Sequence, residues 1–356
     1  MIQKMFISIL AAVLLAGCSQ IGPAMVTRDR FDYNTAVSQS WKAQTLLNII
    51  KLRYADMPLF IDVASIVSGY SLESSVSLGG NIFEGASTPD NLSLGTAGKF
   101  IDRPTITYAP ITGSKFNKTF LTPLPPSAVL FLIQSGWPAN IVLPISMEAI
   151  NGLRSPKLVG AGQRRGDPRY YRVIELFRKI QRSGAIGVRV MGEENDKESL
   201  FIVIRSKDVP EDVTAAAEEL AGLLGLQRGA QEYTVSYGEI ARNNKDLAMH
   251  TRSMMSIMIE LSGMIDVPAH HIEEGRTLPA LGKPLSKDDP HRLISIRHSR
   301  NEPDDAFIAV QYKDYWFWID DRDFKSKRTF AYLMILFSLT ETGGSESLPL
   351  VTIPAG

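Results

Sequence analysis

Cysteine is almost absent from this sequence, because Cys18 is the single one among 356 residues. A lone cysteine excludes an intramolecular disulfide, a zinc site built from several thiolates, and dithiol redox chemistry. The chain must therefore be held together by the burial of apolar side chains. Its content of 44% hydrophobic residues is sufficient for a substantial core.

A surplus of either charge is also missing, since Lys and Arg number 38 and Asp and Glu number 38. Nucleic-acid-binding proteins usually carry a basic surplus, so we expect no nucleic-acid partner. The sequence lacks the G-x-S-x-G pattern of serine hydrolases and the complete phosphate-binding P-loop pattern. We find no cofactor, no metal site and no small-molecule ligand in these patterns, and we expect a protein that is not an enzyme.

The N-terminus has the features of a signal peptide. Lys4 precedes an apolar run from Met5 to Leu15, which is too short to span a bilayer. The run ends in Leu15-Ala16-Gly17-Cys18, which resembles the lipobox of bacterial lipoproteins. We therefore expect a signal peptide over residues 1–17, lipidation of Cys18 and a lipidated tether over residues 18–33. Acyl chains on Cys18 would hold the protein on a membrane and would leave no free thiol.

The residue after the cysteine bears on the location. Ser19 follows Cys18, and by resemblance to enterobacterial sorting a residue other than aspartate favours the outer membrane. We expect a lipid-anchored outer-membrane protein with the bulk of its chain in the periplasm.

The rest of the chain predicts an α+β fold with mixed or antiparallel sheets. Residues 34–153 should form a helix capped by Asn34, a long β-hairpin and short helices. Residues 154–167 are polar and contain glycine, so they should form a linker. Residues 168–237 should be a first α-β-β-α-β module, starting at a helix capped by Asp167. Residues 238–356 should be a second, similar module that begins with a Met-rich helix near Asp246.

The predicted hairpin has one apolar and one polar face, because residue type alternates along both strands. In the stretches 70–83 and 91–111 the apolar residues share one parity, and the opposite face is rich in Ser, Gly and Asn. The apolar parity is interrupted at Ser74, Gly80, Thr96, Gly98 and Asp102. The candidate contact face consists of Tyr70, Leu72, Val76, Leu78, Leu92, Leu94 and Phe100.

Three interpretations of this apolar face are open. It packs on a helix of the same chain, it joins the hairpins of neighbouring subunits, or the joined hairpins close into a ring or barrel that crosses the outer membrane. Membrane strands need about 9–11 residues, and both stretches are long enough. One hairpin alone cannot enter lipid, because its edges would be unsatisfied.

Two acidic or histidine-rich clusters are candidate sites. Asp320, Asp321 and Asp323 lie between a predicted strand and a helix, where carboxylates hold a divalent cation or cap the helix. His270 and His271 are adjacent, so their side chains should diverge. The run that contains them is predicted to be a solvated loop rather than a metal site.

Several phrases together are similar to a family of uncharacterised lipoproteins of Gram-negative bacteria. They are "LLNIIKLRYADMPLFIDVASIVSGYSL", "RPTITYAPITGSKF", "LTPLPPSAVLFLIQSGWP", "EAINGLRS" and "YWFWIDDRDFKSKRTFAYLMILFSL". The resemblance implies an envelope location and no activity, ligand or catalytic residue.

The expected function is that of a structural or interaction component of a cell-envelope assembly, with protein partners or self-association. The alternative is a lipid-anchored periplasmic enzyme, a metal-assisted hydrolase that uses Asp320, Asp321 and Asp323.

Overall fold

The computed structural model describes residues 23–67, 69–81, 91–159, 163–192, 198–205, 209–279 and 291–340. These segments contain both helices and sheets, so the mixed α+β class is as expected. The chain divides into two compact units, a smaller one built on Phe60–Ile111 and a larger one built from the residues on both sides of it. The predicted signal peptide and Cys18 lie outside the described residues.

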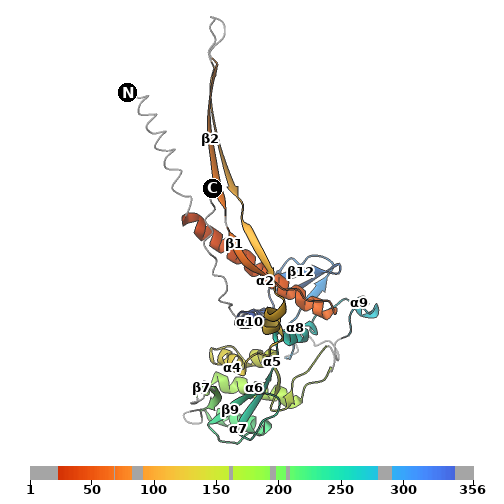
Figure 1. Cartoon of the computed structure of the whole chain (residues 1–356). Coiled ribbons are helices and arrows are strands. Elements are labelled where there is room, and N and C mark those ends of the chain that lie inside the picture. Colours follow the sequence, from red (N-terminus) through yellow and green to blue (C-terminus); the bar gives the residue numbers. More distant parts are fainter. Residues whose placement is uncertain are drawn as a thin grey trace. The chain divides into compact units, whose positions relative to one another are not determined.

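The smaller unit consists of two antiparallel strand pairs. Strand β1 (Ile61–Val67) pairs with β4 (Thr105–Pro110), and β2 (Tyr70–Asn81) pairs with β3 (Asn91–Asp102). The second pair forms the long two-stranded ribbon of Figure 1. The hairpin is therefore present, but the stretch predicted as one strand over residues 91–111 is two strands. Pro104 lacks the N–H that a continuous ladder would need, and β4 turns to β1.

Helix α2 (Pro23–Arg53) starts the larger unit. It begins inside the segment 18–33 that was predicted as a tether, and Asn34 is an interior position rather than its cap. The first half of the helix is mostly exposed, and burial begins around Thr45 and Leu46. The sequence pattern therefore located the part of the helix that packs and missed the part that does not.

A six-stranded sheet in the order β6-β5-β10-β9-β8-β7 forms the main layer of the larger unit. All its pairs are antiparallel except β9 with β10. The strands are β5 (Met147–Ile150), β6 (Leu153–Arg154), β7 (Ile186–Gly192), β8 (Glu198–Ile204), β9 (Glu232–Tyr237) and β10 (Asp246–Thr251). Helices α6 (Pro168–Arg182) and α7 (Glu211–Leu223) bring Phe177 and Leu220 against Ile202 and Tyr233 of the sheet.

The ends of α6 agree with the sequence reading. The Asp167 side chain accepts a hydrogen bond from the Arg169 amide at 2.9 Å, and Pro168 occupies the first turn. Gly184 follows the helix with a φ of +72°, a conformation that glycine adopts without strain.

A three-stranded sheet with the order β11-β13-β12 lies near the C-terminal end of the described chain. Its strands are β11 (Arg297–Ser299), β12 (Ala306–Tyr312) and β13 (Tyr315–Asp320), and helix α10 (Phe324–Thr340) follows. Tyr315 and Phe317 on one face of β13 are buried, whereas Trp316 and Trp318 are half-buried. One aromatic face is thus core, as alternation along a strand predicts.

Shorter helices complete the larger unit. They are α3 (Gly113–Phe116), the π-helix η2 (Asn117–Leu121), α4 (Pro126–Gln134), α5 (Ala139–Ser146), α8 (Met254–Ser262) and α9 (Ala269–Glu273). Within the described residues, no helix combines the length and the apolar character required to span a membrane.

Three predicted boundaries are wrong. The Met-rich helix does not begin near Asp246, because residues Asp246–Thr251 form β10 in the centre of the sheet. The division at residues 237 and 238 would separate β9 from β10, which pair in parallel. The division of residues 34–153 as one region fails as well, because the compact unit Phe60–Ile111 lies inside it.

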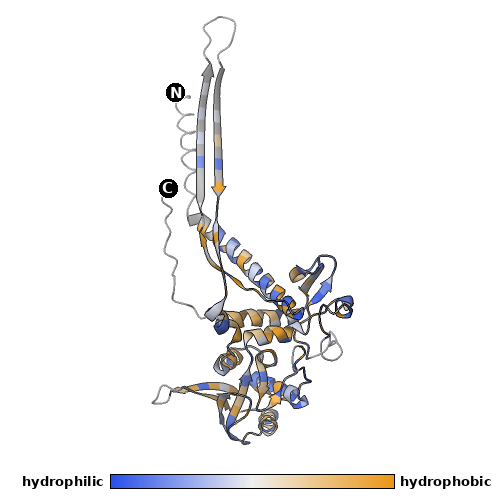
Figure 2. Ribbon diagram, turned by 45° about the vertical axis from the view of Figure 1, so that its right-hand side comes forward, coloured by the Kyte–Doolittle hydropathy of each residue, from blue (hydrophilic) through white to orange (hydrophobic). Residues whose placement is uncertain are grey.

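The core of the larger unit is apolar, with Leu46, Val129, Met258, Phe317 and Leu333 almost fully buried. Figure 2 shows hydrophobic residues gathered on its packed helices and sheet strands. One polar contact lies within this core, where the hydroxyl groups of Ser146 and Tyr332 are 2.7 Å apart and both residues are inaccessible. Burial raises the pKa of the Tyr332 phenol, so the phenol stays neutral.

The Ser146–Tyr332 contact makes a prediction about stability. Tyr332→Phe should lower the free energy of unfolding by about 1–3 kcal/mol, because it leaves the buried Ser146 hydroxyl without a partner. Adding Ser146→Ala should restore part of that loss, since both polar groups are then gone. Denaturant unfolding of the two single variants and the double variant measures the coupling. Strictly additive losses would show that the contact contributes nothing.

Candidate functional site

The β2–β3 hairpin aligns the apolar parities of its two strands. Its register pairs Leu72 with Phe100 and Leu78 with Leu94 among twelve residue pairs. Residues directly opposite each other in an antiparallel ladder share a face, so the backbone places the predicted apolar residues on one face. The contacts of the side chains of Tyr70, Leu72, Val76, Leu78, Leu92, Leu94 and Phe100 lie outside the described part of the chain.

The described positions of the opposite face of the hairpin are exposed, except for Ile101, which is half-buried. The register sets Glu73 opposite Lys99, a pairing of opposite charges that suits a solvated face. The exposed positions of this face are Glu73, Ser75, Ser77, Gly79, Gly95, Ala97 and Lys99.

The apolar parity of the hairpin continues into β4, where the side chains are described. Ile106 is 39% exposed and Tyr108 is 61% exposed. The register of β1 with β4 sets Ile66 beside Ile106 and Val63 beside Tyr108. The side chains of Ile106 and Tyr108 are therefore exposed, and this part of β4 does not pack them into a core.

Each strand of the hairpin has one outer edge. Among the described residues, β2 and β3 form a sheet of two strands, and the outer edge of each carries no further strand. Such edges present unpaired backbone N–H and C=O groups that can accept another strand. A two-stranded hairpin is also only marginally stable by itself in water. The geometry therefore suits the addition of further strands.

The three aspartates after β13 do not converge on a common point. Asp320 accepts hydrogen bonds from Arg297 at 2.6 Å and from the Arg322 amide at 2.9 Å. Asp321 contacts Lys327 at 2.7 Å. Asp323 accepts from the amide of Ser326 at 3.0 Å and from its hydroxyl at 2.6 Å.

Asp323 is thus the cap of α10, and the other two carboxylates are paired with cations. In the described ranges, His, Asp and Glu side chains form no group of three able to hold a metal ion.

The histidine pair differs from its prediction. His270 and His271 lie on the short helix α9 rather than in a solvated loop, and His271 is buried. Its Nδ1 atom is 2.7 Å from the hydroxyl of Tyr54, in the turn that follows α2. Burial lowers the pKa of His271 and raises the pKa of Tyr54 to about 12, so both groups are neutral at physiological pH. The pair helps to pack the turn after α2 against α9.

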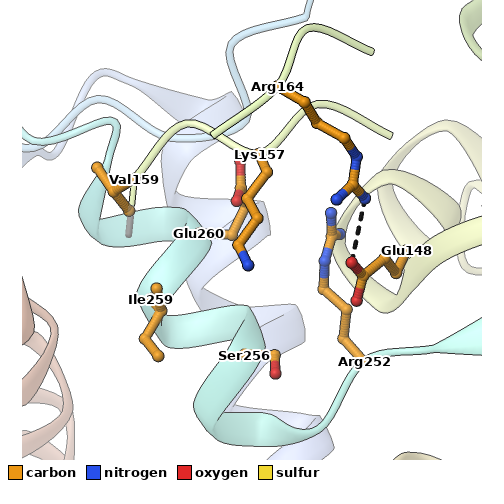
Figure 3. A pocket seen from close by; sticks show the side chains of 8 residues that line it. All are labelled: Glu148, Lys157, Val159, Arg164, Arg252, Ser256, Ile259 and Glu260. Atoms are coloured by element: carbon orange, nitrogen blue, oxygen red, sulfur yellow. Dashed lines mark hydrogen bonds and ion pairs between the residues drawn. The ribbon is translucent and has the colours of Figure 1, made fainter. Parts of the chain in front are cut away.

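A polar cavity of about 190 Å³ lies in the larger unit (Figure 3). It is bounded by β5, the start of α8 and the segment after β6 that was predicted as a linker. That prediction is wrong, because Ser155 and Val159 are buried and Lys157 and Arg164 pair through their backbones. The lining residues are Glu148, Lys157, Val159, Arg164, Arg252, Ser256, Ile259 and Glu260.

Arg252 is the most buried cation of this cavity, with 5% exposure. Its Nη1 atom donates to the carbonyl oxygens of Pro144 at 2.7 Å and Ile145 at 3.0 Å. Its Nη2 atom donates to the Ser155 hydroxyl at 2.6 Å. These acceptors are neutral, and no ion pair between Arg252 and a carboxylate occurs among the described side chains.

The two carboxylates of the cavity have different environments. Glu148 pairs with Arg164 at 3.1 Å, and although burial opposes ionisation, Arg164 and Arg252 together lower the pKa of Glu148. Glu260 accepts a hydrogen bond from the Leu158 amide at 3.1 Å, and burial raises the pKa of its carboxyl.

Lys157 completes the cavity. Figure 3 shows its ammonium group pointing into the space between Glu260 and Arg252. No hydrogen bond or ion pair joins this ammonium group to another described side chain, although it lies in the field of Glu260. The sequence offered no sign of this arrangement, because the basic and acidic residues come from segments about a hundred positions apart.

Comparison of this chain with family models, with curated proteins and with solved structures gives no significant match. The lipoprotein resemblance therefore remains a prediction from the sequence.

The aspartates generate one prediction. Asp323→Ala should lower the free energy of unfolding by about 0.5–2 kcal/mol, because it removes the cap of α10. Asp321→Ala is the matched control and should change it by less than about 0.5 kcal/mol, since it removes one exposed ion pair. Thermal or denaturant unfolding measures both. Equal effects of the two substitutions would contradict the capping role of Asp323.

The buried Glu260 generates a prediction on pH. The unfolded chain releases the Glu260 proton at the ordinary pKa, whereas the folded chain holds it to higher pH. Stability is therefore greatest below the ordinary pKa and falls as the pH rises through the raised one.

Glu260→Gln should abolish this decline, and the same substitution at the exposed Glu211 should not. Unfolding free energies measured across acidic and neutral pH test this. Parallel curves for the wild type and Glu260→Gln would show that burial does not penalise the Glu260 charge.

Proposed function

We propose that this chain is a lipid-anchored outer-membrane lipoprotein that serves as a structural component of a cell-envelope assembly. In this proposal the acylated Cys18 holds the protein on the membrane, and copies of the chain associate through their β2–β3 hairpins. We also propose the order of parts along the chain, in which a helix and a long hairpin precede two sheet-containing parts.

The anchor is supported by the sequence. Lys4, the apolar run and the Leu15-Ala16-Gly17-Cys18 motif occur in the order that lipoprotein signal peptides require. The absence of any other cysteine agrees with a chain whose one thiol is consumed by lipid.

Self-association is supported by one observation above all, the twelve-pair register of β2 with β3. This register sets the apolar pairs Leu72–Phe100 and Leu78–Leu94 on one face and the charged pair Glu73–Lys99 on the other, whereas Val76 lies opposite Thr96 and Ser71 lies opposite Ile101. It also leaves both outer edges able to pair with another strand. A second copy supplies a matching hairpin with the same length and the same division into faces, so repeated pairing of this kind extends the sheet and closes it into a ring.

The dimensions of the hairpin suit a lipid environment for the apolar face of such a ring. Each strand has twelve residues, and a membrane-crossing strand needs about 9–11. Apart from Ile101, the described positions of the polar face are small or charged and exposed, as a face turned to water should be. The uncovered Ile106 and Tyr108 extend the apolar parity beyond the hairpin.

The enzymatic alternative remains a prediction of the sequence. The separate partners of Asp320, Asp321 and Asp323 do not support a shared metal among these three side chains.

The size of the full-length protein extracted in detergent tests self-association. We expect the extracted wild type to be an oligomer, with a mass that is a multiple of the monomer mass. Leu94→Arg should reduce the assembly, because an arginine on the lipid face of a membrane strand costs about 2–4 kcal/mol near the midplane. Ser75→Arg is the matched control, since it adds the same charge to the exposed face of the same hairpin. Light scattering coupled to size-exclusion chromatography gives the masses.

A monomeric wild type would refute self-association, and equal effects of the two arginines would refute the role of the apolar face. The Cys18→Ser chain separates the anchor from the assembly, because it cannot be acylated. If Cys18→Ser still matured and fractionated with membranes like the wild type, the anchor would be wrong whatever the mass of the particle.

A further inference from the structure

The cavity beside α8 holds more positive than negative charge. Lys157, Arg164 and Arg252 are cations, and Glu148 and Glu260 are the carboxylates that face them. With both carboxylates ionised the lining has a net charge of about +1, and protonation of Glu260 makes it more positive. His250 also lies near Glu148.

Several donors in this cavity have no acceptor in the described chain. A guanidinium has five N–H groups, and Arg252 uses three hydrogen bonds to carbonyls and a hydroxyl. The Lys157 ammonium has three donors and none of them is engaged with a described side chain.

A hydroxyl donor and a helix end add to these cations. The Ser256 hydroxyl accepts a hydrogen bond from Ser253 at 3.1 Å, which leaves its own proton to donate. Ser256 also lies in the first turn of α8, where the helix dipole favours an anion.

These donors approach the cavity from different sides. Figure 3 shows Arg164 and Arg252 on one side, Lys157 above the centre and Ser256 below it. A planar carboxylate offers two oxygens in one plane, whereas a tetrahedral oxyanion offers acceptors in several directions. The arrangement therefore favours a phosphate-type group over a carboxylate.

We propose that this cavity is a binding site for a phosphate group, held by Lys157, Arg164 and Arg252 with the Ser256 hydroxyl. The volume of about 190 Å³ is smaller than that of a typical site for a drug-sized ligand. It suits inorganic phosphate or the phosphate end of a small ester. A phospholipid headgroup offers the same chemistry.

The site does not depend on the proposed assembly, because every residue that lines it belongs to the larger unit. A monomeric protein could bind phosphate, and an assembled one could fail to bind it.

Isothermal titration calorimetry of the full-length, detergent-extracted protein tests the site. The probes are inorganic phosphate, glycerol 3-phosphate and acetate, each titrated at constant ionic strength in chloride. We expect saturable binding of at least one phosphate compound and no saturable binding of acetate. Flotation with phosphatidylglycerol vesicles, using the unlipidated Cys18→Ser chain, distinguishes a lipid headgroup from a soluble phosphate.

Lys157→Met is the decisive variant, because it removes a cation that makes no described hydrogen bond and so leaves the packing in place. It should weaken phosphate binding by about tenfold or more, the size expected for one charge-assisted contact. Lys245→Met is the control, since it removes one positive charge from an exposed position that does not line the cavity.

The outcomes are distinct. Loss of binding in Lys157→Met with binding retained in Lys245→Met supports the site. The proposal would be overturned if the wild type showed no saturable phosphate binding in calorimetry and the Cys18→Ser chain did not bind the vesicles. Equal binding by Lys157→Met and the wild type would also overturn it, as would an equal decrease in both variants, which would indicate a general effect of net charge.

Discussion

The capping of α5 by Arg252 is the contact on which the arrangement around the cavity depends. Helix α5 ends at Ser146, and the last carbonyls of a helix have no partner within it. The Arg252 guanidinium donates to Pro144 and Ile145, and its backbone amide donates to Ser146 at 2.7 Å. A cation there also lies at the negative end of the helix dipole. One residue between β10 and α8 thus closes a helix more than a hundred positions earlier.

This use of Arg252 determines the charge of the cavity. Because its partners are neutral carbonyls and a hydroxyl, no carboxylate in contact cancels its charge. Glu148 is committed to Arg164, and Glu260 is held against the Leu158 amide. Lys157 then gives the lining a net positive charge, because the other two cations are matched in number by the two carboxylates. A positive surplus in a partly buried cavity is costly without an anion, and this cost is the physical reason to expect one.

The sequence predicted elements that depend on local order. The hairpin with its alternation, α6 with its Asp167 cap and the buried face of Tyr315 and Phe317 all follow from neighbouring residues. The predictions from sequence were wrong where contacts with distant segments determine the local structure. Asp246–Thr251 continues into an apolar helix and reads as its start, but the partners β5 and β9 make it a strand. The polar segment after Arg154 reads as a linker, but Arg252 and Glu260 hold it in place.

The β2–β3 hairpin and the cavity beside α8 also differ in whether neighbouring or distant residues form them. This difference determines what the sequence alone can predict about each. The hairpin repeats residue types along adjacent strands, so its two faces can be predicted from the sequence. The cavity is a convergence of single side chains from three segments, so no local pattern marks it. The ligand that we propose for the cavity is constrained by its charge, its donors and its volume, which are all properties of this chain. The alternating faces of the hairpin thus predict the kind of contact it makes, and the side chains of the cavity predict the kind of ligand it binds.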